Sequence, residues 1–151
     1  MKKIILSTFL LLFAGTGLLA QTPVTSTMND NPNAPEISFE NEVLDYGTIE
    51  YNSNGEREFK FKNTGKEPLV IQSATGSCGC TVPTPPKDPI KPGETASIKV
   101  KYDTKRVGNF EKTITVISNA KNGTVMLRIK GQVKPDPNPP QQQNTNGTNP
   151  K

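Results

Sequence analysis

Apolar and polar residues alternate with a period of two along the centre of this chain, and this alternation restricts what it can fold into. Phe59 and Phe61 alternate with lysines, and Ile98, Val100 and Tyr102 do the same. Successive side chains of a strand point to opposite faces, so each such run buries one face and exposes the other. The pattern therefore predicts antiparallel sheets with one side against a core and one side in water.

Turn-forming residues separate these runs at intervals of roughly eight to twelve positions, which is typical of a β-sandwich. We therefore predict an all-β, immunoglobulin-like antiparallel β-sandwich of about seven strands. A barrel of about five or six strands is the structural alternative. Prolines between Pro68 and Pro92 exclude a helix through the middle. The predicted strands are Ile37–Phe39, Val43–Ile49, Glu56–Asn63, Leu69–Thr75, Thr95–Tyr102, Asn109–Ser118 and Val125–Val133.

Several short motifs are interpreted as structural. Asn122 and Gly123 between two alternating runs favour a type I′ hairpin, in which both central residues have positive φ. Tyr46 is expected in the core and Gly47 in a bulge. Asp103 follows a predicted strand and is expected to bond nearby backbone amides in an Asx turn.

The two ends of the chain differ from the alternating part. Residues 1–20 combine two lysines, an apolar run and a small residue, as in a secretory signal peptide. Residues 21–35 are predicted as a flexible linker, 36–134 as the folded domain, and 135–151 as a disordered tail rich in Pro, Asn and Gln. We therefore expect an exported protein, periplasmic or secreted, with no transmembrane span after cleavage of the signal. Its oligomeric state stays open.

Composition excludes several functions. The chain has no histidine, so catalysis by Ser-His-Asp or Cys-His pairs is excluded. Without Lys2 and Lys3 of the signal, the 18 basic residues fall to 16 against 14 acidic ones, a net charge of +2. The basic residues form no cluster with aromatic residues, so we expect no nucleic-acid partner.

The only two cysteines, Cys78 and Cys80, lie in a proline-rich segment between Thr75 and Pro92, the longest break in the alternation. Residues two apart in a strand point the same way, and a kink at Gly79 would bring the cysteines within disulfide range. Three interpretations stay open: a structural pair, a redox or thiol-exchange site, or a copper(I) site. Zinc would need further ligands. The candidate redox or ligand-binding residues are Cys78 and Cys80, with loop support from Ser77, Gly79, Thr81 and Pro83.

Several ordered stretches resemble the bacterial exported family known as domain of unknown function 1573. The resemblance implies an immunoglobulin-like sandwich similar to interaction domains of cilia and sperm proteins, with no established activity and no catalytic residues to transfer. Pro85 and Pro86 stand where similar sequences often have an aromatic residue. The matching stretches include Leu44–Ile49, Phe61–Gly65, Pro68–Ile71, Ser77–Pro83, Pro89–Glu94, Val100–Thr104, Gly108–Lys112 and Ser118–Ala120.

Together these observations predict a non-enzymatic interaction or structural module of the bacterial cell envelope, with a protein partner and no cofactor. The alternative is a thiol-redox or copper-handling protein that uses Cys78 and Cys80. A second alternative is a carbohydrate-binding module. Such modules present aromatic platforms, and the tyrosines of this chain are Tyr46, Tyr51 and Tyr102.

Overall fold

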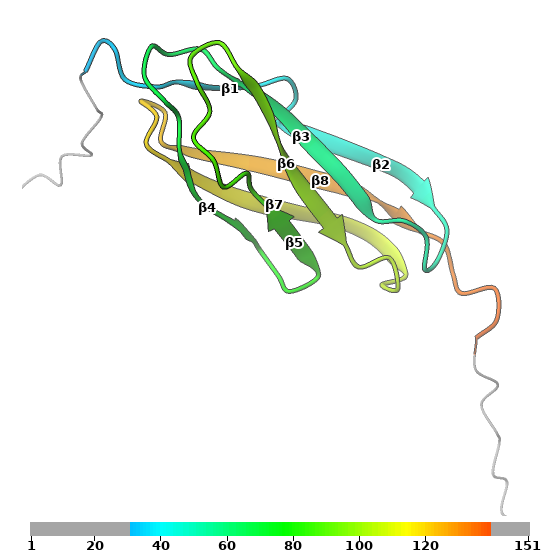
Figure 1. Ribbon diagram of the computed structural model, residues 1–151. Helices are drawn as coiled ribbons and strands as arrows, with labels where there is room; N and C mark the ends of the chain where they lie inside the picture. The colour runs from blue at the N-terminus through cyan, green and yellow to red at the C-terminus, as the bar shows by residue number, and fades with distance from the viewer. Residues whose placement is uncertain (1–30, 140–151) are drawn as a thin grey trace, which may run out of the picture.

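The computed structural model describes residues 31–139, which form eight strands in two facing sheets (Figure 1). The predicted signal peptide, most of the predicted linker and residues 140–151 of the predicted tail lie outside the described residues. The strands are β1 (Ile37–Phe39), β2 (Val43–Ile49), β3 (Glu56–Asn63), β4 (Ile71–Gly76), β5 (Thr81–Thr84), β6 (Thr95–Tyr102), β7 (Gly108–Ser118) and β8 (Thr124–Val133).

The strand order confirms the predicted immunoglobulin-like fold. One sheet has the order β1-β3-β6-β5 and the other β2-β8-β7-β4. These orders match the ABED and CFG sheets of an immunoglobulin domain, with β2 added beside the last strand. Within residues 31–139 there is no helix that could cross a lipid bilayer.

The N-terminal part of the chain changes sheet between its first two strands. β1 pairs with β3, whereas β2 pairs with β8, and the β2–β8 pair is parallel while all other strand pairs are antiparallel. The bulge expected at Gly47 is present: Gly47 has φ of 62°, and the β2–β8 register shifts between Asp45 and Thr48. The Gly47 amide donates to the Asp45 carboxylate over 2.8 Å, which lowers the pKa of Asp45.

The segment between Thr75 and Pro92 is more regular than the sequence predicted. It contains β5, the one strand of the eight that the sequence did not predict, and β5 pairs with the second half of β6. Further along, Ile90 bridges to Leu69, so Leu69 lies outside β4 and the strand begins at Ile71 instead. The prolines of this segment argued against a strand in the sequence, because each proline lacks a backbone donor that a paired strand normally uses.

The hairpin between β7 and β8 is present, but its predicted type I′ turn is wrong. Neither Asn122 nor Gly123 has positive φ. The Asn122 side chain instead bonds the backbone of Ile37 in β1, accepting from its amide over 3.2 Å and donating to its carbonyl over 2.8 Å. These bonds connect the loop to the other sheet, and the loop spans the residues between Ser118 and Thr124.

Three aromatic rings fill the core at one end of the sandwich. Tyr102 stacks on Phe110 with ring centroids 3.9 Å apart, and Tyr46 meets Phe110 edge-on at 5.4 Å. Tyr46 is only 6% exposed, as the sequence predicted, and its hydroxyl donates to the Gly55 carbonyl over 3.1 Å. Burial raises the pKa of Tyr46 to about 12, against an opposing effect of Arg57.

This raised pKa predicts a loss of stability at high pH. Above pH 10 the unfolded chain ionises Tyr46, while the folded chain keeps the proton until pH is about 12. Stability should therefore fall across this window, by on the order of 2 kcal/mol for this residue. Urea unfolding at several pH values checks this, with Tyr46→Phe as the control. An equally steep fall in Tyr46→Phe would contradict the assignment.

Candidate functional site

The two cysteines form a disulfide at the corner where the chain crosses from one sheet to the other. Cys78 and Cys80 lie between the end of β4 and the start of β5, and their Cα atoms are 5.2 Å apart. This spacing falls within the range that disulfides require. The structure thus brings the pair together as the sequence predicted, on an edge of the sandwich.

Backbone contacts fix the residues around the disulfide. The Ser77 amide donates to the Thr113 carbonyl over 2.9 Å, and the Ser77 hydroxyl accepts from the Thr113 amide over 3.3 Å. The Thr81 amide donates to the Cys78 carbonyl over 3.1 Å, and the Thr81 hydroxyl lies 3.8 Å from both sulfur atoms. Gly79 faces open space. The corner is therefore an ordered turn.

The chemistry of the corner is limited by how the sulfurs are held. Cys80 is only 4% exposed and belongs to the core, whereas Cys78 is half-buried. As a disulfide, neither sulfur is a thiolate, which is the form that attacks or binds soft metals. Residues 31–139 contain no group of three or more Cys, Asp or Glu side chains arranged to hold a metal ion.

Removing the disulfide should have a small effect on stability. The bond closes a very short loop, and loop-closure entropy then gives only about 1.5 kcal/mol. We therefore expect the double variant Cys78→Ser/Cys80→Ser to remain folded and to lose no more than roughly 2 kcal/mol in urea unfolding. Failure of the double variant to fold would show that the pair does more than close this turn.

Most exposed sheet edges carry a feature that hinders pairing with another chain. β1 has only three residues. β2 is interrupted by the bulge at Gly47, and β4 by a register shift between Ile71 and Ser73. Short strands and bulges are common protections against unwanted strand addition.

The edge of β5 is protected by Pro83. The Asp103 amide donates to the Cys80 carbonyl over 2.9 Å, and bonds to β6 then recur at every second residue, at Val82 and Thr84. The backbone nitrogen of Pro83 therefore faces away from β6. Because proline has no amide hydrogen, this edge lacks a donor for an added strand.

One stretch of sheet edge has no such protection. β1 pairs with β3 only at residues 61–63, and one further bond runs from the Glu40 amide to the Lys60 carbonyl. The Tyr102 amide donates to the Gly55 carbonyl, so even-numbered residues of β3 direct their backbone groups away from β6. Within residues 31–139, no strand pairs with this side of β3 from Glu56 to Glu58.

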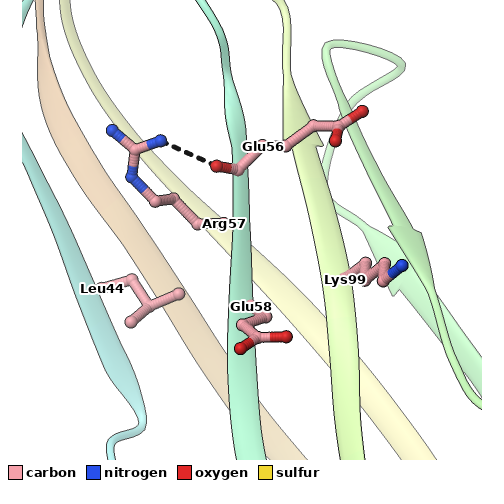
Figure 2. A pocket seen from close by; sticks show the side chains of 5 residues that line it. All are labelled: Leu44, Glu56, Arg57, Glu58 and Lys99. Atoms are coloured by element: carbon pink, nitrogen blue, oxygen red, sulfur yellow. Dashed lines mark hydrogen bonds between the residues drawn. The ribbon is translucent and has the colours of Figure 1, made fainter.

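Side chains occupy part of this open edge. The Glu56 amide donates to the Asn54 side chain over 2.9 Å, and the Glu56 carbonyl accepts from the Arg57 guanidinium over 2.7 Å (Figure 2). The backbone amide and carbonyl of Glu58 have no partner in the described part of the chain. Glu58 thus offers one donor and one acceptor to an incoming strand.

A groove of about 430 Å³ lies along this stretch of β3, with Leu44 of β2 on one side and Lys99 of β6 on the other (Figure 2). A second hollow of about 200 Å³ continues it toward the end of β1, and Leu44 and Glu58 line both. The guanidinium of Arg57 lies 4.8 Å from the centre of the Tyr46 ring. The groove is lined by Leu44, Glu56, Arg57, Glu58 and Lys99, and its continuation by Glu40, Asn41, Leu44, Glu58, Phe59 and Lys60.

The sequence interpretation missed this groove. One signal was available: Arg57 has the same parity as Phe59 and Phe61, whose side chains are fully buried, so a charged residue stands on the inward face of β3. Arginine at an inward position indicates that the core is open there. The pairing of β1 with β3 stops before it reaches Arg57, because the chain crosses to the other sheet after β1. A period-two pattern does not indicate where such a crossing occurs.

Comparison with known proteins gives a family and a fold. The model of the family described as "Protein of unknown function (DUF1573)" matches residues 37–133. None of the curated proteins matches the chain.

Many solved structures resemble the chain, among them two with low sequence identity. A protein of unknown function from Porphyromonas gingivalis W83 has a TM-score of 0.59 and 18% identity, covering 67% of this chain and 48% of its own. This chain thus spans about half of that protein. The ASH/PapD-like domain 7 of human CEP192 has a TM-score of 0.55 and 11% identity, covering 83% of this chain and 99% of its own. At these identities the likeness concerns the fold.

Proposed function

The chain belongs to the DUF1573 family, whose function is unknown, and from this premise we propose that it is a non-enzymatic protein-binding module of the bacterial cell envelope. The signal-like segment at residues 1–20 supports export to the periplasm or the medium. The immunoglobulin-like sandwich is a scaffold of a kind that many interaction domains share. The module acts without a cofactor or a metal.

The observation that carries this proposal is the contrast between the sheet edges. Four edge strands are short, bulged or blocked by proline, whereas β3 presents an open stretch beside a groove. An extended segment of a partner would pair with Glu58 and place alternate side chains in the groove. Strand addition of this kind is a common mode of peptide recognition.

The alternatives have weaker support. Tyr46 and Tyr102 are buried in the core, so they offer no platform for a sugar ring, and only Tyr51 is partly accessible. Thiol exchange or copper binding at Cys78 and Cys80 requires that the disulfide is first reduced. We propose that this pair, with Ser77, Gly79, Thr81 and Pro83, serves mainly to fix the corner between the sheets.

Photo-crosslinking in cells tests the proposal. A photoreactive amino acid at Glu58 should give a discrete crosslinked product, whereas the same residue at Thr84, beside the blocked edge of β5, should not. Glu58→Pro removes the outward amide without breaking a bond to β6, so it should abolish capture, whereas Glu58→Ala, which removes the carboxylate alone, should retain it. Equal products at both positions, or none at Glu58, would refute a cellular partner that adds a strand at β3.

A further inference from the structure

We infer that the segment bound along β3 is extended and runs antiparallel to β3, in line with β1. It has an apolar residue at its first position and basic residues at its second and fourth positions. This inference rests on the proposed function, because it specifies the chemistry of the partner at the same edge.

The register of β1 fixes where each residue of an added strand lies. Phe39 pairs with Phe61, and the Glu40 amide bonds the Lys60 carbonyl. Continuing the same antiparallel line, the first four added residues lie opposite Phe59, Glu58, Arg57 and Glu56 in turn. This chain leaves that line itself, because Val43 already pairs with β8 in the other sheet.

The first and third added residues point to the inner side of the groove, where Leu44 and Arg57 lie. The first lies beside Leu44 and the ring of Phe59, so an apolar side chain removes surface from water there. The third lies next to Arg57, whose guanidinium packs over Tyr46 and already fills part of the groove. A small side chain suits this position.

The second and fourth added residues point to the outer face of the sheet, opposite Glu58 and Glu56, which line the groove together with Lys99 of β6. Both carboxylates are held only weakly: Glu58 lies 3.9 Å from the Lys60 ammonium, Glu56 lies 3.9 Å from the Lys101 ammonium, and all four side chains are about half exposed or more. Glu40, just after β1, adds a third carboxylate to a lining that also contains Arg57, Lys60 and Lys99, so the opposite charges must come from the residues directly across from Glu58 and Glu56. Lysine or arginine at these two positions places opposite charges directly across the strands, while acidic residues would repel.

Peptide binding to the full exported chain tests the inference. The probes are blocked peptides with Val-Lys-Ser-Lys, Val-Gln-Ser-Gln or Val-Glu-Ser-Glu between identical neutral flanks, followed by backbone amide NMR. The basic peptide should bind about 2- to 25-fold more tightly than the neutral one, since each opposite-charge pair contributes about 1.5- to 5-fold. The acidic peptide should bind most weakly, and amide shifts should centre on Glu58.

Matched variants separate charge recognition from a general effect of net charge. Glu56→Lys/Glu58→Lys should reverse the preference, so that the acidic peptide binds best. Glu36→Lys/Glu111→Lys makes the same change in net charge away from the groove and should leave the preference as it was. A reversed preference in the control, or an unchanged one in the groove variant, would overturn the inference.

N-methylation of the peptide tests its direction of pairing. The amide of the second residue faces Glu58, so methylating it should abolish binding, whereas methylating the third amide, which faces away, should be tolerated. Should crosslinking at Glu58 succeed while the three peptides bind equally or not at all, the partner chemistry is wrong and the proposed function stands. If crosslinking fails while the basic peptide binds as expected, β3 recognises that peptide, but the proposed binding of an envelope partner is refuted.

Discussion

Replacing Asn63 with alanine is expected to lower the free energy of unfolding by about 3–5 kcal/mol, the largest loss we predict for a polar residue. Asn63 lies at the end of β3 and is fully buried. Its side-chain oxygen accepts from the backbone amides of Gly65 (3.0 Å) and Glu36 (3.4 Å). Its side-chain NH2 group donates to the backbone carbonyls of Glu67 (2.8 Å) and Ile90 (3.0 Å). One side chain therefore satisfies backbone groups from three separate segments.

The cost arises because truncation leaves the amides of Gly65 and Glu36 and the carbonyl of Glu67 without these partners at a partly buried site, while the Ile90 carbonyl keeps only its bond from the Leu69 amide. Each orphaned group costs about 1–3 kcal/mol. Asn63→Asp should also be destabilising, because a carboxylate cannot donate to the two carbonyls. The control is Asn54→Ala, which removes a single exposed bond to the Glu56 amide. A loss below about 1 kcal/mol for Asn63→Ala in urea unfolding would contradict this role.

A side chain at Gly76 should be nearly as damaging, at about 3 kcal/mol for Gly76→Ala. Gly76 is the last residue of β4, immediately before the disulfide corner. A Cβ atom there would lie 2.1 Å from the Thr81 carbonyl oxygen. Because the obstacle is backbone, the start of β5 must move, and its bonds to β6 move with it.

Gly79 supplies the matched control for this prediction. It lies in the same turn, between the cysteines, and a Cβ atom there meets nothing within 4 Å. Gly79→Ala should therefore change stability by less than about 0.5 kcal/mol. Urea unfolding of both variants, with the disulfide verified by mass, measures the contrast. If Gly76→Ala lost as little stability as Gly79→Ala, the corner would tolerate the displacement of β5.

Much of this fold follows from the alternation of residues, and the exceptions have physical causes. Runs such as Glu56–Asn63 and Thr95–Tyr102 form strands at the predicted bounds because each has one apolar face. β5 escaped prediction because Thr81–Thr84 is short and contains proline. The parallel pairing of β2 with β8 also escaped, since periodicity gives the face of a strand but not its neighbour.

The candidate site divides in the same way. Spacing alone predicted that Cys78 and Cys80 meet, because residues two apart are constrained by the chain between them. The groove beside β3 combines Leu44 of β2 with Arg57 and Glu58 of β3, and its existence depends on β1 stopping at Phe39. Such a site depends on where an element ends, which is the least predictable property of a strand.

The pairing of β2 with β8 has a mechanical consequence. The described chain enters and leaves at opposite ends of the sandwich (Figure 1), and β2 and β8 run in the same direction along each other. Tension applied between the two ends would therefore slide these strands lengthwise, loading their bonds together rather than one after another. A domain built in this way resists stretching along the line between its two ends.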